Sequence, residues 1–264
     1  MSRLKNNKIK QLLSKWPYGV VLTSYWLTKH GYYKQLIKKY CDSGWIRKVG
    51  QGAYLKIGEQ LQWPGAVYAL QKELNLPMHV GSITALELHG LAQNVAFNET
   101  KSPFYLFNTT AHKKPLPKWF SEAFPECIYI QRHLFKRNEN LESRKVDNVT
   151  IDIASPEQAI LELLALVPQK FDYAHAHDLV ENLRLLRPQI TRTLLQQCLS
   201  IKVKRLFLYL AEKHHLPCFT HLNIKSLDLG KGKRKIGQGG HYIAKYQISV
   251  PILREKEEEG IGHV

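Results

Sequence analysis

Tyr33, Lys34 and Gln35 form a polar stretch that continues in two further lysines, Lys38 and Lys39. A glutamine amide can pair with the edge of an adenine, and a lysine ammonium can reach the acceptor atoms of guanine. Lysines also hold backbone phosphates and so fix the register of a protein on duplex DNA. This set of side chains therefore has the chemistry needed to bind DNA and read its bases.

A helix has to position these side chains. Leu36, Ile37 and Tyr40 recur at helical spacing and predict a helix over residues 32–43 with one apolar, buried face. The lysines and the glutamine would then lie on the outward face. Gly44 follows the last turn and predicts the end of the helix.

The neighbouring segments predict the rest of a small domain. Residues 8–16 and 25–30 have the pattern of two shorter helices, and residues 45–49 and 53–56 have that of two short strands. Helix, short helix, turn, helix and β-hairpin is the order of a winged helix-turn-helix, whose third helix enters the major groove.

The predicted hairpin would supply the wing. Gly50 and Gly52 flank Gln51, and glycines suit the positive φ angles of a tight hairpin turn. Arg47, Lys48 and Gln51 would set a basic wing against the DNA backbone or the minor groove. Winged helices also serve as protein-binding modules, and exposed lysines would suit such a module, so this alternative stays open.

Composition agrees with a nucleic-acid partner. The 264 residues carry a formal net charge of +16, and the sequence pI is about 9.6. Such a basic protein tends to bind a polyanion, because neutralised phosphates release counterions. The four cysteines form no C-x-x-C pair, and no apolar run approaches the roughly 20 residues of a membrane helix. We expect a cytoplasmic protein with reduced thiols, no cofactor and no membrane partner.

Beyond the winged helix, predicted over residues 1–60, the chain predicts a larger mixed α/β domain over residues 61–264. Residues 62–65 suggest a linker between the two. Within the larger domain we expect strands over about 97–153, helices over about 155–215 and a final strand over about 241–250. The fold class predicted for the whole chain is therefore α+β.

Two groups could suggest chemistry. His175 and His177 project about 200° apart on a helix, so the pair does not predict a metal site. Asp152 follows Asp147 and could suggest a nuclease, but no further acid and lysine follow at the spacing that such a site needs. We predict no catalytic residue and no metal ligand, and keep a nuclease-like enzyme as the alternative.

Residues 230–240 are rich in glycine and cations. Lys231, Lys233, Arg234 and Lys235 lie among five glycines, but no G-K-S/T sequence or following helix makes a P-loop. A solvated loop, an arm that contacts phosphate and a loop that contacts a protein partner all fit this segment.

Three motifs in a fixed order resemble one known family. They are VGQGAY at residues 49–54, GSITALELHG at 81–90 and SPEQAI at 155–160. Together they resemble the AbiEi antitoxins of type IV toxin–antitoxin systems, which act in bacterial phage defence by abortive infection. The likeness runs from about residue 8 to residue 250.

The resemblance implies a regulator and not an enzyme. In this family an N-terminal winged helix binds inverted repeats in the operon's own promoter and represses transcription. The C-terminal part counteracts a nucleotidyltransferase-type toxin. The expected partners are therefore operator DNA and a cognate toxin, met functionally or in direct contact.

Overall fold

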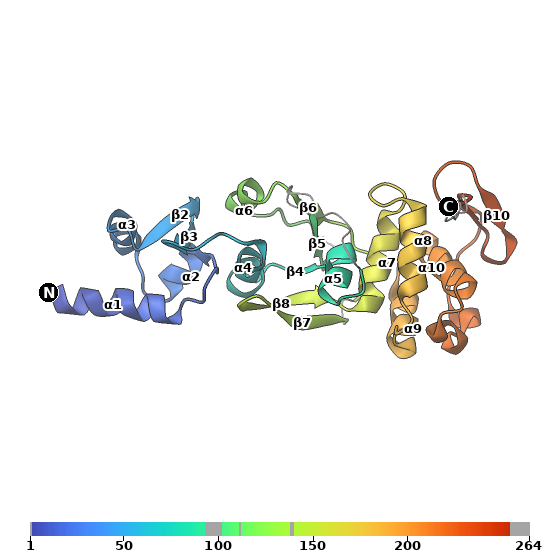
Figure 1. Ribbon diagram of the computed structural model, residues 1–264, viewed down its shortest axis with the longest axis horizontal. Helices are drawn as coiled ribbons and strands as arrows, with labels where there is room; N and C mark the ends of the chain where they lie inside the picture. The colour runs from blue at the N-terminus through green and yellow to red at the C-terminus, as the bar shows by residue number, and fades with distance from the viewer. Residues whose placement is uncertain (1, 93–101, 111, 138–139, 254–264) are drawn as a thin grey trace, which may run out of the picture. The chain divides into compact units, whose positions relative to one another are not determined.

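The computed structural model describes residues 2–92, 102–110, 112–137 and 140–253, with side chains from residue 8 onward (Figure 1). The chain divides into two compact units. Unit 1 comprises Met1–His133 and Arg137–Ala159, and unit 2 comprises Leu134–Lys136 and Ile160–Val264.

Unit 1 begins with the elements of a winged helix-turn-helix. They are α1 (Ser2–Lys15), β1 (Leu22–Thr23), α2 (Ser24–Lys29), α3 (Lys34–Asp42), β2 (Ile46–Gly50) and β3 (Ala53–Lys56). The strands form an antiparallel sheet in the order β1-β3-β2. The predicted winged helix-turn-helix order is confirmed, although α3 begins after Tyr33, whose extended backbone (φ −76°, ψ 160°) makes it the N-cap.

Buried side chains explain why these short elements hold together. Ile9 and Leu12 line one face of α1, and Trp16 directly follows the helix. All three pack in the same hydrophobic core as Leu36 and Ile37 of α3. A helix of this length is marginal alone, so burial of its apolar face supplies most of its stability.

The linker predicted at residues 62–65 is wrong. These residues begin the helix α4 (Trp63–Tyr68), which continues as the π-helical turn η1 (Ala69–Glu73). A Cβ added at Gly65 would lie 1.9 Å from the carbonyl oxygen of Gly19, so α4 packs directly on the backbone of the winged helix. Pro64 and Gly65 are therefore buried residues in the first turn of α4, where Gly65 packs against the winged helix. The boundary predicted after residue 60 falls inside unit 1 and stays a prediction.

The rest of unit 1 is a five-stranded sheet with flanking helices. Its strands are β4 (Met78–Val80), β5 (Phe104–Asn108), β6 (Cys127–Ile130), β7 (Leu141–Val146) and β8 (Val149–Ala154), in the order β6-β5-β4-β8-β7. The two helices α5 (Ser82–Leu88) and α6 (Lys118–Ala123) lie between strands in sequence. The β4–β8 and β5–β6 pairs are parallel, and the other two are antiparallel.

Within the predicted strand region, β-branched and aromatic residues predict strands at residues 104–107, 127–130 and 149–153, and these are confirmed as β5, β6 and β8. No such pattern marks β4 or β7. β7 is an edge strand whose central residues Ser143, Arg144 and Lys145 are exposed, so it has no apolar alternation to detect. Charged edge strands of this kind discourage pairing with other chains. Residues 97–101, at the start of the predicted strand region, lie outside the described residues.

Unit 2 is helical and ends in a small sheet. After α7 (Pro156–Leu166), which enters it from unit 1, come α8 (Tyr173–Asn182), α9 (Pro188–Gln197) and α10 (Ile201–Lys213). The 3-10 turns η2 (Pro217–His221), η3 (Ile224–Ser226) and η4 (Ala244–Tyr246) and the strands β9 (Arg234–Lys235), β10 (His241–Ile243) and β11 (Ile248–Val250) complete it.

The single strand predicted over residues 241–250 is wrong. The 3-10 turn η4 reverses the chain, and Gln247 takes a left-handed conformation (φ 47°) that completes the reversal. β10 and β11 therefore pair with each other as an antiparallel hairpin. A continuous β-rich sequence hid this turn because it contains no glycine or proline.

Candidate nucleic-acid interface

The outward face of α3 carries the cations that the sequence singles out. Lys34, Gln35, Lys38 and Lys39 are all exposed. The opposite face is anchored in the core by buried Leu36, Ile37 and Tyr40. The polar side chains therefore stand on a rigid helix, as a recognition helix requires.

Two surface hollows join α3 to the wing. One is lined by Lys34 of α3 together with Lys48 and Gln51 of the hairpin. The other is lined by Gln35 and Lys38, again with Lys34 and Lys48. The structure thus brings five of the predicted contact residues around one surface.

The same hollows contain side chains that the sequence did not single out. Ser24 and Thr28 of α2 and Tyr54 of β3 line the first hollow. Their hydroxyl groups are the kind that donate to phosphate oxygens. Only the tertiary structure reveals them, because α2 and β3 gave no sequence signal beyond their secondary structure.

The other three predicted contact residues lie differently. Tyr33 is exposed at the N-cap of α3 and Lys39 is exposed farther along the helix, but neither lines these hollows. Arg47 is half-buried, and its guanidinium donates a hydrogen bond to the carbonyl oxygen of Glu59 at 3.2 Å. Arg47 therefore braces the chain after β3, whereas Lys48 is free of that contact and exposed.

Close packing fixes the wing in place. Gly52 has φ +75°, and a Cβ there would lie 2.9 Å from Ser24 Oγ. The Ser24 amide donates to the Gly52 carbonyl oxygen at 2.7 Å. A Cβ at Gly50 would lie 2.7 Å from Cβ of Trp119 on α6. The glycines are therefore required both for the turn and for contact with two helices.

A buried carboxylate anchors the start of α2. Glu73 Oε2 accepts a hydrogen bond from the backbone amide of Thr23 at 2.9 Å, and the Thr23 hydroxyl caps α2 by accepting from the Trp26 amide. Burial raises the pKa of Glu73 to about 7, with the Thr23 hydrogen bonds opposing that shift. The N-terminus of α2 therefore depends on a group that titrates near neutral pH.

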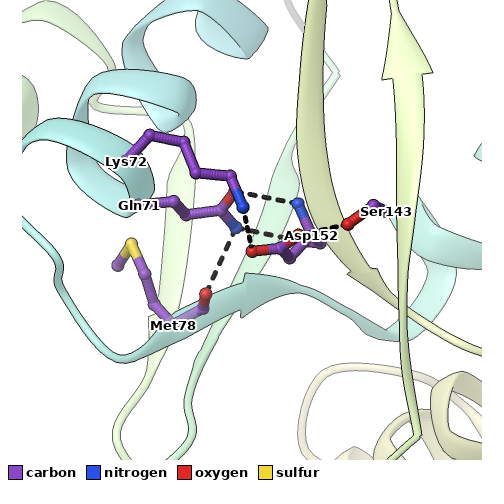
Figure 2. A network of polar contacts seen from close by, with 5 residues as sticks. All are labelled: Gln71, Lys72, Met78, Ser143 and Asp152. Carbon is purple, nitrogen blue, oxygen red and sulfur yellow. Dashed lines mark hydrogen bonds and ion pairs between the residues drawn. The ribbon is translucent and has the colours of Figure 1, made fainter.

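The nuclease alternative rests on Asp152, whose carboxylate is already occupied (Figure 2). Its Oδ2 pairs with the Lys72 ammonium at 2.6 Å, and its Oδ1 accepts from the Ser143 hydroxyl at 2.8 Å. The Gln71 side chain bonds both to the Asp152 backbone and to the Met78 carbonyl oxygen. These contacts tie η1 to β4 and β8, and they explain Asp152 as a structural residue.

The basic segment near the C-terminus is held by a buried arginine. Arg205 of α10 donates to the carbonyl oxygens of Leu229, Gly230, Gly232 and Gln247. Lys231, Lys233 and Lys235 remain exposed, and Arg234 is half-buried. The ammonium of Lys233 lies 5.0 Å from the centre of the Tyr242 ring. The backbone of this segment is therefore ordered, and its lysine side chains face solvent.

A helix with one cationic face beside a braced wing defines the chain's first part as a winged-helix module of the kind found in transcriptional regulators. Comparison with family models identifies the family. Residues 5–97 match the N-terminal domain of the AbiEi antitoxin transcriptional regulators, and residues 104–251 match the model described as "Transcriptional regulator, AbiEi antitoxin, Type IV TA system". The chain belongs to this family of transcriptional regulators and antitoxins.

A solved structure shares the fold. The RV2827C protein from Mycobacterium tuberculosis matches with a TM-score of 0.53 and 16% identity, over 94% of this chain and 89% of that one. At this identity the match supports the fold alone. No curated protein matches the chain significantly. Across the residues that the structure describes, no helix is long and apolar enough to cross a membrane.

Proposed function

We propose that this protein represses its own operon by binding inverted repeats in the promoter, and that it counteracts a nucleotidyltransferase-type toxin. The observation that carries the first part is the shared surface of Lys34, Gln35, Lys38, Lys48 and Gln51. It combines cations for phosphates with amides for base edges, on elements held by a buried core.

In this proposal α3 lies in the major groove of each half-site. Gln35 reads a base edge with Tyr33 beside it, and Lys34 and Lys38 complete the reading face. Lys39, Arg47 and Lys48 hold phosphates, and Gln51 at the tip of the wing contacts the backbone or the minor groove. Because Arg47 already braces Glu59, its contribution is smaller than that of Lys48.

The toxin partner is proposed from family membership. A regulator and antitoxin works where the chromosome and the toxin are, so we place this activity in the cytoplasm. The exposed lysines of residues 231–235 are candidates for contact with phosphate or with the toxin, because the backbone that presents them is held by Arg205.

The first test is a fluorescence anisotropy titration of the full chain against its own upstream DNA at several salt concentrations, with an unrelated duplex as competitor. Steeply salt-dependent binding that survives the competitor is expected. If Lys34 anchors a phosphate, Lys34→Ala should weaken binding to all duplexes and lower the salt slope by about one unit. Lys170→Ala removes an exposed lysine of unit 2 and is the matched control. Equal, weak binding to both duplexes would overturn the repressor role.

The antitoxin role has a separate test. The gene adjacent to this protein's own is induced alone and together with the full chain, and bacterial growth is followed. Co-expression should restore growth if the neighbour is the toxin. A variant with Lys34→Ala and Lys48→Ala should lose repression while keeping growth rescue, because family members combine two activities in one chain. Growth arrest that the wild-type chain does not relieve would contradict the antitoxin role.

A further inference from the structure

Two histidines from different helices meet in unit 2. His177 lies on α8 and His214 follows the last residue of α10. Their ring centres are 4.2 Å apart, with an angle of 70° between the ring planes. Figure 1 shows α8 and α10 side by side. The sequence spacing pairs His177 only with His175, which is exposed, whereas the fold turns His177 inward to a partner far along the chain.

A carboxylate completes the group. Glu181 lies four residues after His177 and therefore shares its face of α8. Its Oε1 atom is 3.9 Å from Nδ1 of His214. The potential ligand atoms of His177, Glu181 and His214 all lie within 4.8 Å of one another. Among the described residues, this is the one group of three or more histidine, cysteine or acidic side chains so closely placed.

Both imidazoles have an unused nitrogen. The Nε2 atoms of His177 and His214 are buried, and neither makes a hydrogen bond within the described part of the chain. His177 is only 9% exposed. A buried polar atom without a partner destabilises the fold, because the hydrogen bonds it made to water are lost and not replaced. A cation bound through such a nitrogen would remove that penalty, because an imidazole nitrogen lone pair is a metal ligand.

Neighbouring groups favour the ligand form. Nδ1 of His177 lies 3.3 Å from Oδ1 of Asp178, the carboxylate contact that commonly orients a metal-binding histidine and leaves its Nε2 free to ligate. Burial lowers the pKa of His214, and the neighbouring His177 and Lys213 lower it further while Glu181 and Asp178 oppose them.

We propose that His177, Glu181 and His214 bind one divalent transition-metal ion, with Zn²⁺ as the preferred ion, and that the ion clamps α8 to α10. Two imidazoles and one carboxylate are a ligand set that zinc accepts, with water or a partner's side chain in the fourth position. Bonds of about 2.0–2.2 Å would bring the ligand atoms to about 3.4 Å apart. Glu181 can follow this contraction because its side chain is 58% exposed.

The test uses the full chain after treatment with EDTA and exhaustive dialysis. Zn²⁺ is titrated in by isothermal calorimetry, and Co²⁺ is titrated in parallel while visible absorption is recorded. We expect one tight site per chain, and visible Co²⁺ bands with the intensity of tetrahedral coordination. Zn²⁺ should also raise the Tm, because an ion that binds only the folded state stabilises it by mass action. Failure of the wild-type chain to bind one equivalent at micromolar concentrations would overturn the proposal.

Variants locate the site. Glu181→Gln removes a ligand from an exposed position, so the fold should survive, and it should weaken Zn²⁺ binding at least tenfold. His214→Gln should abolish the Co²⁺ bands. His175→Ala is the matched control, since it removes an exposed histidine from the same helix and should bind as the wild type does. If Glu181→Gln binds Zn²⁺ as tightly as His175→Ala, the assignment is wrong, whatever the behaviour of the buried histidine variant.

Discussion

Two basic regions of this molecule have similar compositions and different physical roles. On α3 the cations stand on a helix whose other face is buried, so the core fixes where each lysine points. In residues 229–240 the fixed part is the backbone, which three hydrogen bonds from Arg205 hold in place while a fourth reaches the Gln247 carbonyl oxygen. In the first region the exposed lysines are placed to contact a partner. In the second region the charge with a structural role is that of the buried Arg205.

This difference shows that net charge alone does not identify a binding surface. Arg205 is 2% exposed and adds to the charge of +16 without being available to a polyanion. The charge of Arg47 is less available to a polyanion than that of Lys48, because the Arg47 guanidinium donates a hydrogen bond to the Glu59 carbonyl oxygen. What distinguishes the α3 surface is that several exposed cations and amides surround the same hollows.

The largest expected effect is from Arg205→Met. Four carbonyl oxygens would lose a charged donor, so we expect a loss of about 3–5 kcal/mol in the free energy of unfolding. Urea denaturation followed by circular dichroism measures it. Arg234→Met is the control, because that half-buried guanidinium donates only to the adjacent Lys233 carbonyl oxygen in the hydrogen bonds described. If both variants lose a similarly small amount of unfolding free energy, Arg205 does not hold the second basic region in place.

The next largest effect is the pH dependence of stability that Glu73 causes where it supports α2 of the winged helix. The pKa of Glu73 is about 7 in the fold against 4.5 as its ordinary value, so the folded state holds a proton that the unfolded chain has released. Its stabilising contribution is full below pH 4.5 and is lost as the pH rises through about 7. The total loss is of the order of 3 kcal/mol.

Glu73→Gln removes this titration and should flatten the dependence of unfolding free energy on pH between about 5 and 8. Urea titrations at several pH values check this. Glu87 also has a pKa raised to about 7 by burial, so Glu87→Gln tests whether the effect is shared. A Glu73→Gln profile as steep as that of the wild type would contradict the role of Glu73.

A smaller effect is expected for base reading by the α3 surface. If Gln35 pairs with a base, Gln35→Ala should relax the preference at a single operator position by about 1–3 kcal/mol and leave the others unchanged. Affinities for a set of operators with single base-pair changes provide the measurement. Gln196→Ala, an exposed glutamine of α9, is the control. An unaltered preference profile would exclude Gln35 as a reading residue.

The smallest expected effects are the changes in the salt dependence of DNA binding when single cations are removed. Lys48→Ala should lower the slope of log affinity against log salt by about 0.9, the value for one phosphate contact. Arg47→Ala should change the slope less, because its guanidinium is engaged by Glu59. Lys233→Ala should change the slope less than Lys48→Ala does, since the Lys233 ammonium lies over the Tyr242 ring. A full unit lost with Lys233→Ala would make residues 231–235 part of the DNA surface.

The local parts of the fold could be predicted from sequence because they follow short-range patterns. Apolar residues at helical spacing gave α3, and glycines beside a polar residue gave the wing. These patterns failed where contacts between distant segments determine which structure a segment adopts. The segment at residues 62–65 has the composition of a linker, but Gly65 is needed where α4 touches the backbone of Gly19. β7 is an edge strand with a charged centre, so it carries no periodic apolar signal.

By itself, the sequence determined the winged helix-turn-helix order, the cationic face of α3 and the motifs of the AbiEi antitoxin family. These depend on residues close together in the chain, where helical and strand periods set the geometry. Only the tertiary structure decided that Arg47 is engaged, that Arg205 holds the basic C-terminal segment, and that His177 meets His214 and not His175. Those outcomes depend on contacts between distant segments, which a sequence pattern does not encode because chain folding alone brings them together.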